Sequence, residues 1–354
     1  MPILKLFAKI LFVIILPLLL LPGCIENVIQ QKTPVELENS ARLLDFIEAQ
    51  GDFANTPEAP GLITASDLYT ALDQFTILDV RPADEFTAGH IATAVNISNH
   101  NLAHVVDSIY TVNSTKKIVL VCKNGQPSAY YTCLLRLLGY RTVYCLKYGM
   151  ASWNSVFADE WFHGQKDHQN ISSFTNDIFD KGPFEPLPPF EPGDPKLSFE
   201  ENCKQRIRQV VLAGFMENQN YIKEVEVQTE DIQYIVCLGP KALYLGGKLL
   251  PDGLFSHIPY TRWYQPFPLY ELRSTNYLQT LPSSREIILY TTNGLLGASV
   301  CAQLTVLGYD VKTILFGGNQ LFHTRMSATA PLVPDVFSNS DIMNFPYTTG
   351  SGKK

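Results

Sequence analysis

Apolar and polar positions along the chain follow an alternation of helices and strands. Apolar residues recur at helical spacing over 35–50, directly before Gly51, which predicts an amphipathic helix ended by a glycine. The segments 76–80 and 117–122 are apolar throughout, and each leads into a stretch of helical character. Fully apolar strands alternating with helices predict a parallel sheet covered on both faces. We therefore predict an α/β fold.

The chain contains two copies of one unit. Three landmarks of the first half recur 169 positions later: Gly125 as Gly294, Gly139 as Gly308 and Gly149 as Gly318. A constant offset over three landmarks indicates an internal duplication, and the length of 354 residues suits two cores of ordinary size. We expect two tandem domains, each a small parallel β-sheet flanked by helices.

Composition divides the chain further. Residues 183–195 contain six prolines and three acidic residues, which is typical of an extended linker, and a helix from about 198 to 215 is expected to open the second domain. The predicted segments are a signal peptide at 1–23, a helical segment at 24–60, a first domain at 61–160, a proline-rich linker at 161–197, a second domain at 198–345 and a disordered tail at 346–354.

The N-terminal segment has the pattern of an export signal. Lys5 and Lys9 precede an apolar run at 10–21 that ends in Pro-Gly-Cys24. A transmembrane anchor is the alternative, but the run is shorter than the ~20 residues that a span needs. The ending resembles a bacterial lipobox, which implies cleavage before Cys24 and a palmitate-bearing lipid anchor on its sulfur. We expect a membrane-anchored lipoprotein of the cell envelope, with its domains in the periplasm or outside the cell.

Charge and cysteine spacing exclude several classes of function. The net charge is −7 and no run of basic residues occurs, which argues against a nucleic-acid partner and against electrostatic binding to a membrane. The six cysteines after Cys24 show no C-x-x-C spacing and are too sparse for a disulfide framework. We predict no metal site and no cofactor.

Cys122 is the candidate nucleophile. It ends an apolar strand and is followed by a glycine-containing loop and a helix predicted to start at Pro127 or Ser128. In an open parallel sheet, ligands bind beyond the carboxyl ends of the strands. The amides at the helix N-terminus carry partial positive charge, and Lys123 adds a full charge. We therefore expect a lowered thiol pKa and a reactive thiolate.

Four segments around this loop resemble the rhodanese family. They are ILDVRPADEFTAGHIATAVNI at 77–97, CKNGQPS at 122–128, LLGY at 137–140 and YGMASW at 148–153. The resemblance implies that Cys122 accepts a sulfane sulfur from a small anion such as thiosulfate, holds it as a persulfide, and passes it to a thiol-like or cyanide-like acceptor.

The resemblance also implies roles for the neighbouring residues. The substrate-binding positions would be Lys123, Asn124, Gly125, Gln126, Pro127 and Ser128, with backbone amides around the terminal sulfur and with Lys123 attracting the anionic donor. We interpret Asp79, Arg81, Glu85 and His90 as one ion-pair and hydrogen-bond network that braces the loop.

The second copy lacks this chemistry. Thr291 occupies the place of Cys122, and Cys237 and Gly239 stand where Asp79 and Arg81 stand in the first copy. A threonine hydroxyl without a neighbouring base does not replace a thiolate. One site per chain is expected, with the second domain in a structural or partner-binding role.

Two other functions are considered. A cysteine phosphatase needs an arginine at the end of a longer loop, whereas Ser128 stands six residues after Cys122 and the nearest arginine is Arg136. A non-catalytic rhodanese-like scaffold that binds another envelope protein stays open, since an exported thiolate meets oxidising conditions. The leading hypothesis is a sulfurtransferase.

Overall fold

The computed structural model describes residues 34–216, 220–228, 230–249, 257–328 and 336–351. The predicted signal peptide and Cys24 lie outside the described residues. None of the helices in the described part of the chain is long and apolar enough to cross a membrane.

The first half of the chain builds a five-stranded parallel sheet in the order β1-β5-β4-β2-β3. Its strands are β1 (Leu62–Ile63), β2 (Phe75–Asp79), β3 (Val95–Asn96), β4 (Lys117–Val121) and β5 (Val143–Leu146). Its helices are α1 (Pro34–Gln50), α2 (Ala65–Thr70), α3 (Ala83–Ala88), α4 (Asn99–Val112), α5 (Gln126–Leu137), α6 (Met150–Trp153) and α7 (Asp159–Gly164).

The second half builds a parallel sheet in the corresponding order β6-β10-β9-β7-β8. Its strands are β6 (Tyr221–Ile222), β7 (Tyr234–Leu238), β8 (Arg262–Tyr264), β9 (Ile287–Tyr290) and β10 (Val311–Ile314). Its helices are α8 (Phe199–Ala213), α9 (Lys241–Leu249), α10 (Leu295–Val306), α11 (Gly318–Leu321) and α12 (His323–Ala328). The predicted α/β class with two parallel sheets is confirmed, and the domain boundaries stay a prediction.

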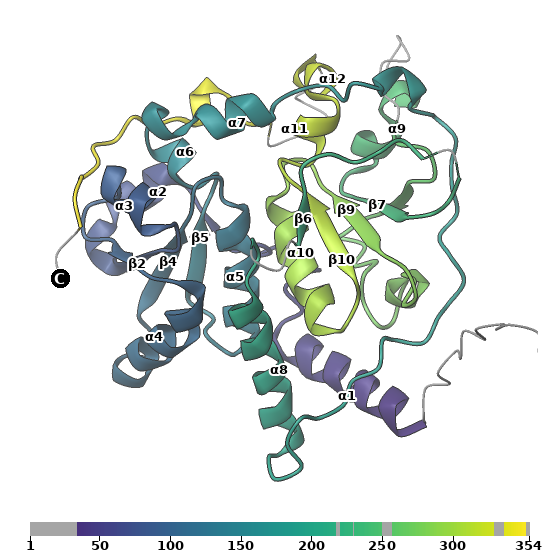
Figure 1. Cartoon of the computed structure of the whole chain (residues 1–354), viewed down its shortest axis with the longest axis horizontal. Coiled ribbons are helices and arrows are strands. Elements are labelled where there is room, and N and C mark those ends of the chain that lie inside the picture. The colour runs from purple at the N-terminus through teal and green to yellow at the C-terminus, as the bar shows by residue number, and fades with distance from the viewer. Residues whose placement is uncertain (1–33, 217–219, 229, 250–256, 329–335, 352–354) are drawn as a thin grey trace, which may run out of the picture. The chain divides into compact units, whose positions relative to one another are not determined.

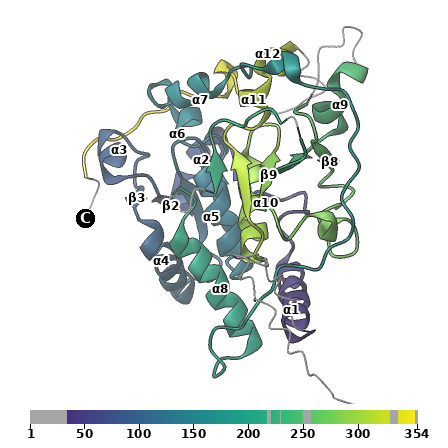
Figure 2. The same cartoon turned by 45° about the vertical axis from the view of Figure 1, so that its right-hand side comes forward.

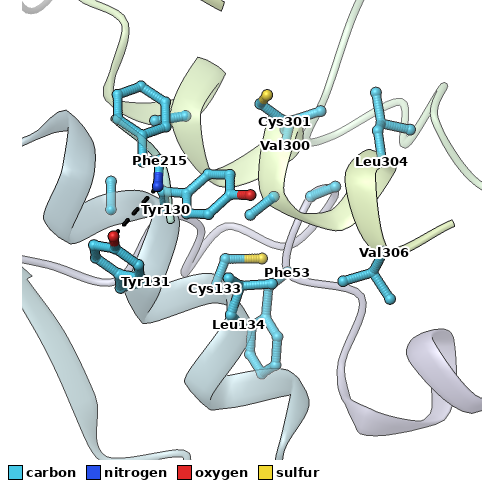
Figure 3. Packing of buried hydrophobic residues seen from close by; sticks show 14 of the residues in the cluster. Phe53, Tyr130, Tyr131, Cys133, Leu134, Phe215, Val300, Cys301, Leu304 and Val306 are labelled. Carbon is cyan, nitrogen blue, oxygen red and sulfur yellow. Dashed lines mark hydrogen bonds between the residues drawn. The ribbon is translucent and has the colours of Figure 1, made fainter. Parts of the chain in front are cut away.

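Helices α5 and α10 pack against each other between the two sheets (Figures 1 and 2). Figure 3 shows Tyr130 and Cys133 of α5 facing Val300 and Cys301 of α10. These residues belong to one hydrophobic cluster that runs through both halves, and burying such area is the main favourable contribution to folding. The two sheets therefore share a core.

Segments that follow each sheet pack on the other half of the chain. Thr175, which follows the first sheet, pairs with His257 of the second half. Thr348, which follows the second sheet, pairs with His90 of the first half through two hydrogen bonds of 2.8 Å. Helix α8, which was counted with the second half, packs on α4 and α5 of the first half, and just after this helix Phe215 N donates to the Tyr131 hydroxyl at 3.2 Å. The halves are interlocked by exchanged segments.

The structure differs from the prediction at the linker and at the tail. Leu187 and Phe190 of the predicted linker are buried in the shared core. In the predicted tail, Tyr347 packs edge-on against Phe157 and Thr348 pairs with His90. Aromatic and aliphatic side chains inserted among prolines and polar residues bury enough apolar area to order both segments.

Candidate active site

Cys122 follows β4, which lies between β2 and β5 in the middle of the first sheet. The chain turns at Gly125, whose φ of +94° is unfavourable for other residues, and α5 starts at Gln126, one residue before the predicted start. A Cβ atom at Gly149 would stand 2.3 Å from the carbonyl oxygen of Cys122. Gly149 thus lets the following helix approach the loop closely.

Three polar groups surround the sulfur of Cys122. Gly125 N donates to Sγ at 3.1 Å and Ser128 N donates at 3.3 Å. The Ser128 hydroxyl lies 3.1 Å from Sγ and also donates to Gly125 O at 2.9 Å. Of the predicted cradle of amides, these two reach the sulfur and would stabilise negative charge on it.

Burial raises the pKa of the Cys122 thiol to about 11, because the charged form loses its hydration. The hydrogen bonds from Ser128 and Gly125 lower this pKa, and the negative charge of Asp79 raises it further. Cys122 is only 2% exposed. The expected lowering of the thiol pKa is therefore wrong for this structure, because the loss of hydration outweighs the hydrogen bonds.

The ammonium group of Lys123 pairs with two carboxylates. Its Nζ lies 3.9 Å from Glu85 Oε1 and 3.8 Å from Glu160 Oε2. Glu160 also accepts a hydrogen bond from Asn124 Nδ2 at 3.4 Å, and burial raises its pKa against the opposing effect of Lys123. The sequence carried no signal for Glu160, because its contact with Lys123 is made only in the folded chain. The charge of Lys123, expected to attract an anion, is balanced by these acids.

The predicted bracing network falls into separate contacts. Arg81 binds both carboxylate oxygens of Asp79, with its closest contact at 2.7 Å, and donates to Gly89 O at 2.7 Å. His90 stacks on Phe86, and its Nδ1 lies 2.9 Å from Phe86 O. Glu85 faces Lys123 instead. Asp79 and Arg81 thus form a buried pair, and a single network of all four residues is not found among these contacts.

The remaining loop residues contact protein groups. Asn124 Oδ1 accepts from Gln126 N at 3.0 Å, and Asn124 O accepts from the indole of Trp161 at 3.0 Å. Pro127 lies in the first turn of α5. The side chain of Gln126 reaches into the second half of the chain, where Gly294 O and Phe316 N are its partners. Asn124, Pro127 and Gln126 therefore shape the loop through contacts with other parts of the protein.

Comparisons with known proteins agree with this geometry. A family model described as a rhodanese-like domain matches residues 64–156. Thiosulfate sulfurtransferase GlpE of Pseudomonas savastanoi pv. phaseolicola is 32% identical over 88 residues, which are 25% of this chain and 80% of that relative. GlpE of Shewanella oneidensis is 34% identical over 85 residues, 23% of this chain and 78% of the relative. This chain belongs to the rhodanese family.

Each of the two relatives matches about a quarter of this chain, and the family model matches residues within its first half. Among solved structures, a thiosulfate sulfurtransferase from Pseudomonas aeruginosa is similar over 89% of this chain and 49% of its own length, with 15% identity and a TM-score of 0.29. Family membership thus rests on the half that carries Cys122.

The second half of the chain repeats the loop with a hydroxyl in place of the thiol. Thr291 Oγ1 accepts from Gly294 N at 3.0 Å, as Cys122 Sγ accepts from Gly125 N. Asn293 Oδ1 accepts from Leu295 N at 3.1 Å, as Asn124 accepts from Gln126 N. The loop keeps its shape without the nucleophile. Across the described residues, no group of three His, Cys, Asp or Glu side chains is placed to hold a metal ion.

Proposed function

We propose that this protein is a rhodanese-type sulfurtransferase that carries sulfur on Cys122. The observation that supports this most is the convergence of two backbone N–H groups on Sγ at the end of a central strand, with the Ser128 hydroxyl 3.1 Å from the same sulfur. Such donors stabilise a thiolate and the negative charge that develops on sulfur during transfer.

The reaction has two steps. The Cys122 thiolate attacks the outer sulfur of a donor such as thiosulfate, an S–S bond forms, the donor's S–S bond breaks, and sulfite leaves with the electron pair. A thiolate or cyanide then attacks the outer sulfur of the Cys122 persulfide, and the Cys122 thiolate is released. Gly125 N and Ser128 N would hold the sulfur charge in both steps.

Burial of the Cys122 thiol limits the first step of the reaction. Because burial raises the pKa of the Cys122 thiol to about 11, the thiol is almost entirely protonated at pH 7. Formation of the Cys122 thiolate therefore requires that water enters the site, or that a bound donor shifts the protonation equilibrium towards the thiolate.

Mass spectrometry after incubation with a sulfur donor tests the proposal. The donors are thiosulfate at high concentration and a small organic persulfide. One extra sulfur atom is expected on the peptide that contains Cys122, and transfer to cyanide is expected to follow. Cys122→Ser must abolish both signals. Absence of the adduct and of transfer with every donor contradicts the proposal.

A second candidate is a non-catalytic rhodanese-like binding protein of the cell envelope. The burial of Cys122, which is only 2% exposed, favours it. A scaffold has no need for an accessible thiol, and burial suits a cysteine that serves only packing. Under this alternative, Cys122 resists both persulfide formation and alkylation in the folded protein. An enzyme shows both reactions.

We also propose that Cys24 carries a palmitate-type anchor and places the protein in the cell envelope. The support is the sequence pattern of basic residues, apolar run and Pro-Gly-Cys ending at 5–24. Labelling with a palmitate analogue is expected to mark the native protein and not Cys24→Ser. Equal labelling of the two proteins, or none, contradicts the anchor.

A further inference from the structure

The side chain of Gln126 joins the active-site loop to the second half of the chain. Gln126 is completely buried. Its Nε2 donates to Gly294 O at 3.2 Å and to Ile314 O at 3.5 Å, and its Oε1 accepts from Phe316 N at 2.8 Å. All of these partners are backbone atoms of the second copy.

The two equivalent loops are packed tightly at this point. A Cβ atom at Gly294 would stand 2.4 Å from Gln126 Nε2, and one at Gly125 would stand 2.7 Å from a methyl carbon of Leu295. No space separates the loop of the first copy from that of the second. Residues of the second copy therefore pack directly against the loop that holds Cys122.

An aromatic contact extends the packing between the two copies. Phe316 packs edge-on against Trp161 with 4.9 Å between ring centroids, and the Trp161 indole donates to Asn124 O at 3.0 Å. Leu295, Phe316 and Trp161 are all buried. Cys122 is 2% exposed, so a donor reaches its thiol only if part of the structure around the loop moves.

We propose that the second copy, in which Thr291 replaces the nucleophilic cysteine, is a cap over the Cys122 thiol, and that Gln126 is the positioning residue that holds the cap closed. Opening at the contact between Gln126 and Gly294, Ile314 and Phe316 would hydrate the thiol and admit the donor. The closed form would shield the thiol, or its persulfide, from water and oxidants.

This role explains how the second copy can keep its loop without its thiol. The cap uses the carbonyl of Gly294, the N–H of Phe316 and the small size of Gly294. These contacts do not need a thiol at position 291, because Thr291 Oγ1 accepts from Gly294 N as Cys122 Sγ accepts from Gly125 N.

Alkylation of Cys122 by iodoacetamide tests the cap, and it requires no sulfur transfer. In Gln126→Leu the rate at Cys122, followed by peptide mass spectrometry, is expected to rise about tenfold, because neutral hydrogen bonds that favour the closed form are lost. The pH dependence of alkylation should report an apparent pKa that falls from about 11 towards the ordinary value of 9.0, which a purely structural effect elsewhere would not produce.

Gln303→Leu is the matched control. Gln303 is also buried, accepts from Ala54 N at 3.1 Å and donates to Asp52 at 3.0 Å. It joins distant segments at the other end of α10, nine residues from Gly294. The same substitution there should change the alkylation rate of Cys122 less than about twofold.

A variant in the second copy tests the same contact from the other side. Gly294→Ala should also raise the alkylation rate, and Gly308→Ala, which has a similar φ of +94° and faces Pro188, should not. Unchanged rates in Gln126→Leu and Gly294→Ala, or equal increases in the controls, overturn the proposal. If neither variant folds, alkylation of the native chain at the rate of global unfolding overturns it, and faster alkylation supports it.

Failure of the cap and failure of the sulfurtransferase are separable. If Cys122 is alkylated at the same rate in all variants but forms a persulfide, the sulfurtransferase proposal is supported and the cap is contradicted. If the alkylation rate responds to Gln126→Leu but Cys122 never accepts sulfur, the cap is supported and the sulfurtransferase proposal is contradicted.

Discussion

Lys123 Nζ and Glu160 Oε2 lie 3.8 Å apart beside the loop that holds Cys122. Glu85 approaches the same ammonium group at 3.9 Å. The lysine next to the nucleophile is thus matched by two acids, an arrangement that weakens its attraction for a dianionic donor.

Removing these acids should improve the use of thiosulfate. In the double variant Glu85→Gln and Glu160→Gln we expect kcat/KM for thiosulfate to rise about two- to fivefold at low ionic strength, and the gain should shrink as salt is added, because Lys123 is half-exposed. Glu200→Gln removes an acid from the exposed pair with Lys204 on α8 and serves as control. A gain that is independent of salt, or equal in the control, contradicts this prediction.

Removing the hydroxyl next to the sulfur should make the thiol less acidic. The hydrogen bond from the Ser128 side chain lowers the pKa of Cys122, so Ser128→Ala should raise that pKa and slow alkylation at pH 8 about tenfold. The control is Ser152→Ala, because the Ser152 hydroxyl donates to Lys147 O and Gly149 O. An unchanged rate in Ser128→Ala would show that the hydroxyl does not act on the sulfur.

Alkaline pH should destabilise the folded protein. Burial raises the pKa of Cys145 from 9.0 to about 12, and comparable increases occur at the other buried cysteines: Cys133, Cys237 and Cys301 to about 12, and Cys122 and Cys203 to about 11. The folded state therefore retains protons that the unfolded chain releases above pH 9. The stability these protonated thiols provide is complete below pH 9 and is lost between about pH 9 and 12.

Urea unfolding at several pH values measures this effect. Above pH 9, Cys145→Ala should reduce the slope of the unfolding free energy against pH by up to one proton, or about 1.4 kcal/mol per pH unit. Parallel curves for the two proteins would contradict the prediction, whatever their offset at pH 7.

The C-terminal segment should stabilise the first sheet. Phe345 stacks on Tyr69 at 4.0 Å and its N–H donates to Trp153 O at 2.9 Å. Phe345→Ala should lower the unfolding free energy by about 1–3 kcal/mol through lost burial. Phe184 is 66% exposed, so Phe184→Ala should cost less than about 0.5 kcal/mol. Equal effects of the two substitutions would contradict a packing role for the segment around Phe345.

Local patterns along the chain correctly predicted several of the regular elements. The apolar run at 76–80 corresponds to β2 (Phe75–Asp79), and the run at 117–122 to β4 (Lys117–Val121). The helical spacing over 35–50 corresponds to α1 (Pro34–Gln50). Element boundaries differ by about one residue, as expected where helix and strand ends fray. Periodicity is a property of neighbouring residues, and the sequence displays it directly.

Only the tertiary structure decided the electrostatics of the site and how far the Cys122 thiol is exposed to solvent. The sequence alone determined that a cysteine follows a buried strand and precedes a glycine turn, with a threonine in the repeated position. The raised pKa of Cys122 depends on what buries it, and the charge of Lys123 depends on Glu160, its neighbour in space. The contact of Gln126 with Phe316 spans 190 residues. Desolvation, ion pairing and covering are set by groups distant in sequence, so no local pattern contains them.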